Sequence, residues 1–177
     1  MDKPSLLLHS CCAPCCSAVL ERLAANYGIT VFYYNPNIFP EEEYRRRLSE
    51  QKRFLNEARY EIALTEGEYA PERFKSAVKG LESLPEGSER CFKCYEFRLR
   101  ETAKTAKARD FEYFTTTLSV SPRKNAGKIN EISAALAGEL GIKSLYADFK
   151  KKDGYKRSAE LSREYGLYRQ KYCGCGL

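Results

Sequence analysis

Histidine and long apolar segments are scarce in this 177-residue chain, and each shortage argues against a class of protein. His9 is the only histidine, so the cysteines have no Cys/His ligand pattern to join, and we expect His9 to be a hydrogen-bonded core residue. Near the N-terminus the apolar run covers only residues 6–8, which is too short for a signal peptide or a membrane span. We therefore expect a cytoplasmic protein that has no membrane partner.

Cysteine is abundant by contrast, and every copy lies in a short cluster. A chain of this length can bury a core without disulfides, and in a reducing compartment clustered cysteines bind metal or do redox chemistry more often than they form cross-links. The eight residues form the clusters Cys11-Cys12-x-x-Cys15-Cys16, Cys91-x-x-Cys94 and Cys173-x-Cys175.

Apolar, β-rich segments alternate along the chain with segments of helical period. Strands are predicted at residues 5–10, 29–35, 60–65, 111–117 and 142–149. Helices are predicted to begin near Pro14, Pro40 and Ser88, with a short helix and loop inserted at 69–88. This pattern predicts an α/β fold, a mainly parallel five-stranded sheet flanked by helices, in a single domain that covers residues 1–177.

Two cysteine pairs stand at predicted helix starts. Cys11 and Cys12 follow the first strand, where a nucleotide-binding relative would carry a glycine-rich loop that this chain lacks. Cys91 and Cys94 lie one turn apart after Ser88, and helix N-termini favour thiolates. Four such sulfurs suit tetrahedral zinc or an iron–sulfur cluster, and spacing alone does not choose. A Cys-Cys dipeptide after a parallel strand is poor zinc-knuckle geometry, which favours the cluster.

The remaining cysteines differ in their expected roles. Cys16 shares the apolar stripe of the first helix and is predicted to be a buried thiol, whereas Cys15 lies at the edge of that stripe and stays undecided. Cys173 and Cys175 are expected to fold back onto the site. They would act there as a redox-active dithiol, or would hold a second metal with a carboxylate such as Asp148.

The charged residues are weaker signals. The chain has 30 Lys+Arg against 24 Asp+Glu and a net charge of +6, which permits a polyanionic partner such as RNA. The run 41–47 pairs Glu with Arg at i,i+4 and is interpreted as a solvated helix face. Arg98, Arg123 and Lys124 are among the basic residues predicted to form a phosphate-contacting surface.

Several long motifs, in order along nearly the whole chain, then resemble one family. LLLHSCCAPC, YNPNIFPEEEYRRRL, CFKCYEFRLRETAKTA, FTTTLSVSPRKN, LYADFK and GLYRQKYCGC are similar to segments of the QueH family of epoxyqueuosine reductases. The resemblance implies a cytosolic iron–sulfur enzyme that reduces epoxyqueuosine at the wobble position of tRNA to queuosine. It also implies a sheet related to the HUP-like, phosphate-loop nucleotide-binding folds.

The resemblance also implies roles for most of the cysteines. A 4Fe-4S cluster would be carried by Cys11, Cys12, Cys91 and Cys94, with Cys173 and Cys175 as a redox-active pair. Removing an epoxide oxygen takes two electrons and two protons, whereas a 4Fe-4S centre usually passes one electron at a time. An external low-potential donor of the ferredoxin or flavodoxin type is therefore expected. The second redox element would be the C-terminal dithiol or a second iron on Cys173, Cys175, Asp148 and Cys15, and Asp148 or Tyr172 would donate protons.

An anticodon base has to be splayed into a pocket that offers stacking and basic contacts. Tyr33, at the end of the second strand, is predicted to line that pocket or to lie in the sheet core. The other residues expected to line the pocket or contact the RNA are Tyr34, Asn35, Asn37, Thr116, Thr117 and Arg123.

Two other functions fit part of the pattern. A thiol-based tRNA sulfurtransferase would use a cysteine persulfide and ATP, and the missing glycine-rich loop counts against it. A zinc-stabilised RNA-binding module would be colourless and would carry stoichiometric zinc.

Overall fold

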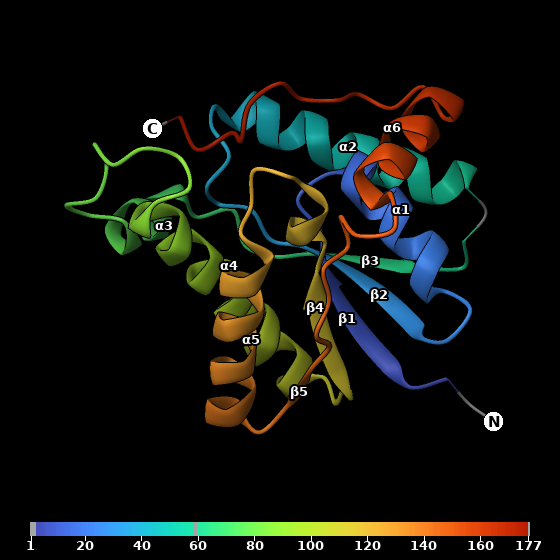
Figure 1. The fold of residues 1–177 in the computed structure, drawn as a ribbon, viewed down its shortest axis with the longest axis horizontal. Coiled ribbons are helices and arrows are strands. Elements are labelled where there is room, and N and C mark those ends of the chain that lie inside the picture. The colour runs from blue at the N-terminus through green and yellow to red at the C-terminus, as the bar shows by residue number, and fades with distance from the viewer. Residues whose placement is uncertain (1–2, 59, 177) are drawn as a thin grey trace.

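Five strands form one sheet between two layers of helices in the computed structural model, which describes residues 3–58 and 60–176 (Figure 1). All described pairings are parallel, in the order β3-β2-β1-β4-β5. The predicted five-stranded α/β fold is confirmed, and the sheet is parallel throughout. The strands are β1 (Ser5–His9), β2 (Gly28–Tyr33), β3 (Ala63–Glu66), β4 (Tyr113–Thr116) and β5 (Lys143–Ser144).

Helices cover both faces of this sheet. On one face lie α1 (Ala13–Leu23), α2 (Glu41–Glu57) and α6 (Gly154–Glu164). On the other lie α4 (Glu89–Ala108) and α5 (Ala126–Leu140), while the short helices are α3 (Pro71–Ala77) and the 3-10 turn η1 (Thr117–Val120). The predicted helix starts near Pro14, Pro40 and Ser88 are confirmed. Ser88 occupies the N-cap position of α4, although its hydroxyl donates to the carbonyl of Pro85 instead of capping the helix.

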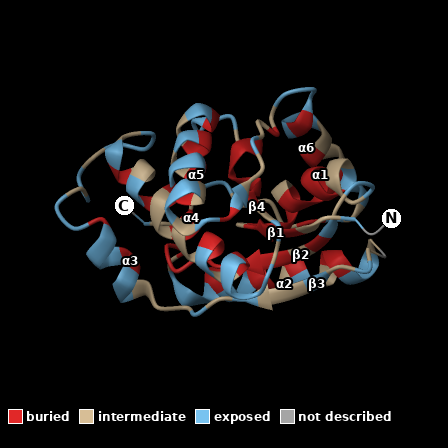
Figure 2. Cartoon of the chain, turned by 90° about the horizontal axis from the view of Figure 1, so that it is seen from below, coloured by how far each residue is buried: buried red, intermediate tan, exposed pale blue. Residues whose placement is uncertain are grey.

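Alternation along β1 divides the core into two clusters. Leu6 and Leu8 face α1 and α2, and Leu7 faces α4 and α5, each fully buried. Figure 2 shows the buried sheet between helices whose outer faces are exposed. Burying each leucine contributes roughly 1.5–3 kcal/mol. Cys16 belongs to the first cluster, so its prediction as a core thiol is confirmed.

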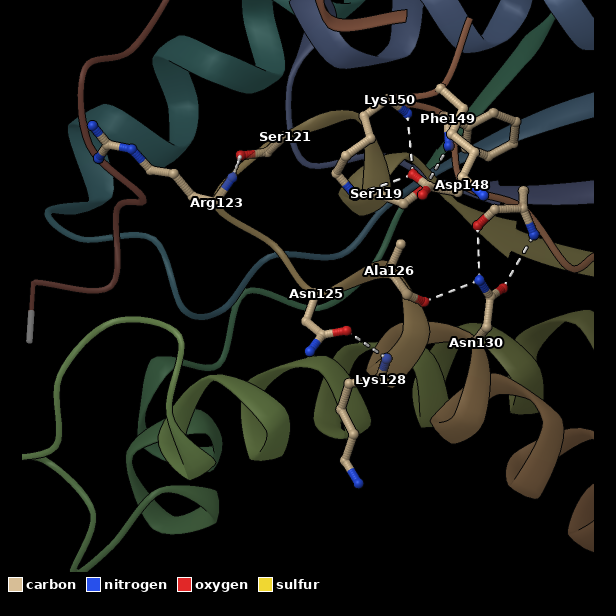
Figure 3. A network of polar contacts seen from close by, with 12 residues as sticks. Ser119, Ser121, Arg123, Asn125, Ala126, Lys128, Asn130, Asp148, Phe149 and Lys150 are labelled. Atoms are coloured by element: carbon tan, nitrogen blue, oxygen red, sulfur yellow. Dashed lines mark hydrogen bonds and ion pairs between the residues drawn. The ribbon is translucent and has the colours of Figure 1, made fainter.

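The last strand is shorter than predicted. The apolar segment 142–149 was expected to be one strand, but only Lys143–Ser144 pairs with β4. Beyond it, Ala147 exchanges two hydrogen bonds with the side-chain amide of Asn130 in α5, at 2.9 and 3.1 Å (Figure 3). The amide of Phe149 donates to the hydroxyl of Ser119. Side chains thus replace the ladder that would have extended the strand.

Strand order reverses at β1, which has β2 on one side and β4 on the other. In open parallel sheets such a reversal leaves a crevice at the carboxyl ends of the strands, and ligands bind there. The C-terminal tail, residues 165–176, returns along α2 towards this end of the sheet (Figure 1). No helix within the described ranges is long and apolar enough to cross a membrane.

Candidate metal centre

Three sulfurs gather where β1 ends and α1 begins. The Sγ atoms of Cys11, Cys12 and Cys15 lie within 4.8 Å of one another, and those of Cys11 and Cys12 are 3.9 Å apart. Cys12 takes the N-cap position of α1 in extended backbone, which directs Cys15 into the first turn of the helix. Among the residues that the structure describes, this is the only group of three potential metal-ligating side chains so closely spaced. Cys15, undecided from its spacing, is therefore a full member of the group.

Polar side chains next to these sulfurs connect the carboxyl ends of neighbouring strands through hydrogen bonds. The hydroxyl of Thr117 accepts from the Cys11 amide at 3.4 Å and lies 3.7 Å from its sulfur, which connects the end of β1 to that of β4. The side-chain amide of Asn35 donates to the Ser10 carbonyl at 2.9 Å. These bonds fix the loop that carries Cys11.

His9 lies fully buried behind the site. Its Nε2 donates to the carbonyl of Tyr34 at 3.0 Å, and its Nδ1 lies 2.9 Å from the Thr116 hydroxyl. Burial, with the nearby charge of Arg98, lowers the pKa of His9 to about 4, so the ring is neutral at neutral pH. The prediction of a hydrogen-bonded core histidine is confirmed.

Cys91 and Cys94 stand in the first turns of α4. The amide of Gly87 donates to the Cys91 sulfur at 3.2 Å. Cys94 is buried in an apolar cluster that also contains Phe74. The C-terminal Cys175 packs against this cluster. Neither Cys91 nor Cys94 joins the close group of Cys11, Cys12 and Cys15 within the described residues.

Two cations, the buried Arg98 and the partly buried Lys124, connect the three cysteine segments. Arg98 is 2% exposed, donates at 3.4 Å to the Asn35 side chain and acts electrostatically on Cys11, Cys94 and Cys173. Lys124 donates from Nζ to the Cys173 sulfur at 3.6 Å and acts on the same three thiols. The cysteines after β1, in α4 and in the tail therefore share one positively charged environment.

These surroundings divide the thiols by protonation state. Hydrogen bonds with Cys12 and Cys15, aided by the two cations, hold the pKa of Cys11 well below its usual value. A hydrogen bond with Cys175, again with Lys124 and Arg98, does the same for Cys173.

Cys12, Cys15 and Cys94 keep their protons. The interaction with Cys11 raises the pKa of Cys12 to about 12 and also raises that of Cys15, while burial raises the pKa of Cys94. A metal that bound Cys11, Cys12 and Cys15 would therefore displace two protons.

The charge balance tests whether these residues suit a metal centre. The Nη2 atom of Arg98 is buried and has no hydrogen-bond partner among the described residues. Burial would lower the pKa of Lys124, but the negative charges of Cys173, Tyr95 and Cys11 together raise it, so the lysine stays charged. Buried cations without a carboxylate need another anion, and thiolates bound to a metal supply that charge. The donor set and its cations fit a thiolate-ligated metal.

A cavity of about 500 Å³ opens above the sulfurs. Cys11, Cys12 and Cys15 line it from the turn after β1 and the start of α1, and Cys173 lines it from the tail. Two half-exposed aromatic rings, Tyr155 and Tyr172, also contribute to the lining. Its charged lining residues are Arg47, Arg98, Arg123, Lys124, Arg169 and Lys171 against the single carboxylate of Glu86.

The residues predicted to bind substrate are only partly brought together. Asn37 and Arg123 line the cavity, and the side-chain oxygen of Asn37 is buried with no hydrogen-bond partner in the described part of the chain. Thr117 supports Cys11 from below. Asn35 and Thr116 are used in the hydrogen bonds that join the strand ends.

Two tyrosines and one carboxylate lie elsewhere. Tyr33 and Tyr34 are buried in core clusters and do not line the cavity. Asp148 follows β5 by four residues, and its Oδ1 accepts from Lys150 Nζ at 3.1 Å. Figure 3 shows Asp148 beside Lys150, with Arg123 extending away from it. Asp148 is not among the residues that line the cavity.

Two predictions about charged residues were wrong. Arg98 was expected on a phosphate-contacting surface but is 2% exposed beside the sulfurs, whereas Lys124 lies at the sulfurs and also lines the cavity, so its predicted phosphate contact stays a prediction. Arg47 was interpreted as part of a solvated face and is 3% exposed, although the pair of Glu41 with Arg45 is exposed as expected. The sequence did contain a sign that these two arginines are buried. Arg98 follows Cys94 by one helical turn, and Arg47 lies beside the buried Leu48.

Known proteins resemble this chain along almost its whole length. A family model described as "Epoxyqueuosine reductase QueH" matches residues 6–177. The epoxyqueuosine reductase QueH of Streptococcus pyogenes serotype M1 is 42% identical over 177 residues, which cover 98% of this chain and 69% of the relative. The protein of that name from Staphylococcus epidermidis is 41% identical over 98% of this chain and 76% of its own length. The protein of that name from Thermotoga maritima is 38% identical over 97% of this chain and 88% of its own length.

Proposed function

The chain belongs to the QueH family of epoxyqueuosine reductases, and we propose that it reduces epoxyqueuosine at the wobble position of a tRNA anticodon to queuosine. The observation that supports this function is the cavity itself. Thiols from two segments, the turn after β1 and the C-terminal tail, would supply redox chemistry at one end of it, and six cations against one carboxylate suit RNA at its lining. Residues 1–177 would act as a single catalytic domain in the cytoplasm.

The proposed metal centre is a 4Fe-4S cluster held by Cys11, Cys12, Cys91 and Cys94. Such a cluster, when bound, supplies low-potential electrons one at a time from a donor of the ferredoxin or flavodoxin type. The shared influence of Arg98 and Lys124 on thiols of both pairs supports this set. The close packing of Cys15 against Cys11 and Cys12 makes Cys15 an additional candidate ligand.

The C-terminal cysteines are proposed as the second redox element. Cys173 and Cys175 would form a redox-active pair or hold a second iron with Cys15. The depressed pKa of Cys173 favours the thiolate that either role requires. Asp148 is a candidate ligand from the sequence alone. In the structure its carboxylate pairs with Lys150.

The reaction also needs protons at the epoxide. Epoxide, two electrons and two protons give an alkene and water. Lys124 stays protonated beside Cys173, and Tyr172 carries a phenol at the cavity, so we propose these two groups as the proton donors. The N–H on Arg98 Nη2 would stabilise negative charge that develops on the oxygen as its C–O bond breaks.

Recognition of the nucleoside would use the remaining lining. The unpartnered side-chain oxygen of Asn37 would accept from a hydroxyl of the modified base. Arg123, Arg169 and Lys171 would contact anticodon phosphates, and Tyr172 would stack on a base.

The test is reduction of tRNA-bound epoxyqueuosine by anaerobically reconstituted protein with a chemical reductant, followed by mass spectrometry of the nucleosides. We expect loss of one oxygen from the modified nucleoside with the wild type and with Cys16→Ala, and no conversion with Cys94→Ser. An unchanged nucleoside in the presence of fully reduced, metal-loaded wild type would refute the proposal. ATP-dependent gain of sulfur would indicate the sulfurtransferase instead.

A further inference from the structure

We propose that Arg47 is a positioning residue that holds the loop Cys173-Gly174-Cys175 at the cavity, and that glycine at 174 is a requirement of that contact. The importance of the loop for catalysis rests on the function proposed above. The contact itself is a property of the folded chain and can be tested without any reaction.

Every nitrogen of the Arg47 guanidinium is engaged, and two of them bind the tail. Nε donates to Glu43 at 2.7 Å, Nη1 donates to the Cys173 carbonyl at 3.0 Å, and Nη2 donates to the Tyr172 carbonyl at 3.4 Å. Arg47 is buried, so these bonds replace water that the charge has lost.

The partner of Arg47 is bound to the same tail. Glu43 accepts a hydrogen bond from the Tyr168 hydroxyl at 3.1 Å in addition to the one from Arg47. A buried ion pair gives little net stability, because desolvation offsets its Coulomb energy. Its two members, one turn apart on α2, instead fix two points of the tail relative to that helix.

Gly174 meets two separate requirements of this arrangement. Its φ is +107°, a conformation that side chains disfavour. A Cβ at this position would lie 3.1 Å from both Nη1 and Nη2 of Arg47, and the Gly174 carbonyl accepts from the Phe39 amide at 2.7 Å. The backbone therefore turns closely against the guanidinium, and a side chain would push one away from the other.

This turn sends the two flanking cysteines to different neighbours. Cys173 reaches Lys124 at the cavity, and Cys175 packs into the cluster that contains Cys94. Without Arg47 the carbonyls of Cys173 and of the preceding Tyr172 would lose these hydrogen bonds, and the Phe39 amide would still bind the Gly174 carbonyl. The sulfur of Cys173 would then be less closely fixed at the cavity, and misplacement by about 1 Å can reduce turnover about 100-fold.

Arg53 provides a matched control on the same helix. It donates to the carbonyls of Tyr165 and Gly166, so it also anchors the tail, but it does so at the start of the tail and does not line the cavity. A general loss of tail packing would affect both arginine variants, whereas a positioning role at the cysteine loop is specific to Arg47.

The test compares the metal-loaded wild type with Arg47→Ala, Arg47→Lys, Gly174→Ala and Arg53→Ala. Brief trypsin treatment, read by mass spectrometry, measures release of the peptides that begin at Gln170 or Tyr172. We expect release to be about tenfold faster for Arg47→Ala and Gly174→Ala, intermediate for Arg47→Lys and near wild type for Arg53→Ala. In turnover, kcat should fall about 10- to 100-fold for Arg47→Ala while KM for tRNA changes less than about twofold.

Two results would overturn the proposal. One is release from Arg47→Ala at the wild-type rate. The other is a raised KM with unchanged kcat, which would make Arg47 a tRNA contact. If the wild type does not reduce epoxyqueuosine, the proposed function fails, and the proteolysis result alone then decides whether Arg47 and Gly174 hold the tail.

Discussion

Individual cysteines of this chain differ in charge because their neighbours differ. Cys11 and Cys173 are favoured as thiolates by hydrogen bonds from other thiols and by Arg98 and Lys124, whereas Cys16 is a protonated core residue. A count of thiols in the sequence does not show this division, which depends on side chains far apart along the chain.

Substitution of the neighbouring residues Cys15 and Cys16 should change different properties, iron content for Cys15 and stability for Cys16. Cys15→Ser removes one of three clustered sulfurs and should lower the iron retained per chain. Cys16→Ala removes a buried sulfur outside the cavity, so iron content should be unchanged while the free energy of unfolding of the apoprotein falls by about 1–2 kcal/mol. Iron and sulfide assays with urea titrations check both, and equal iron in the two variants would contradict a ligand role for Cys15.

Arg98 should have effects of opposite sign in the apoprotein and the metal-loaded protein. Arg98→Met removes a buried, incompletely paired charge, so the apoprotein should unfold with a free energy higher by about 1–3 kcal/mol. The metal-loaded protein should lose iron faster, because the compensating charge is gone. Arg100→Met is a control at a partly exposed position on α4 and breaks pairs with Glu96 and Glu139. It should change the free energy of unfolding by no more than about 0.5 kcal/mol and the rate of iron loss by a correspondingly small factor. Destabilisation of both forms by Arg98→Met would show a purely structural role.

Secondary-structure elements were the part of the fold that the sequence predicted best. Helix starts at Pro14, Pro40 and Ser88 follow from local chemistry, and the β-rich segments follow from periodicity. The length of β5 did not follow, because it is set by Asn130, a residue of α5 that supplies hydrogen bonds to Ala147. Tertiary hydrogen bonds of this kind leave no local pattern.

Asn130 should therefore matter for stability more than a helix residue usually does. Asn130→Ala leaves the backbone N–H and C=O of Ala147 without their partners and should lower the free energy of unfolding by about 2–3 kcal/mol. The substitution Lys128→Ala, at a partly exposed side chain on the same helix, is the control. Urea titration of both apoproteins measures the difference, and equal midpoints would mean that water replaces the amide.

Across the whole molecule, the chain folds so that three cysteine segments come under the charges of Arg98 and Lys124 near the reversal of strand order. The first of them was predictable, because it directly follows β1. The approach of the tail was only an expectation. The contacts that bring it back come from Glu50 and from Arg47 and Glu43 on α2, and the charge pattern alone assigned the latter two to solvent. Buried ion pairs and solvated ones have the same spacing in sequence.

The charge of the cavity predicts how tRNA binding depends on salt. Arg123→Ala should weaken binding several-fold and reduce the slope of log affinity against log salt by about 1, because one phosphate contact is lost. Lys52→Ala, an exposed change on α2 that is not part of the cavity, is the control. Fluorescence anisotropy with labelled tRNA at several salt concentrations gives both slopes, and identical slopes would place the RNA on another surface.

The central claim is that the thiols at this sheet edge form a redox centre that deoxygenates tRNA-bound epoxyqueuosine. Its most direct test is an anaerobic single turnover in which reduced protein is mixed with epoxyqueuosine-containing tRNA, and visible absorbance and nucleoside masses are followed together. We predict reoxidation of the centre with two electrons consumed for each queuosine formed. Queuosine formed without reoxidation, or reoxidation without queuosine, would contradict the claim.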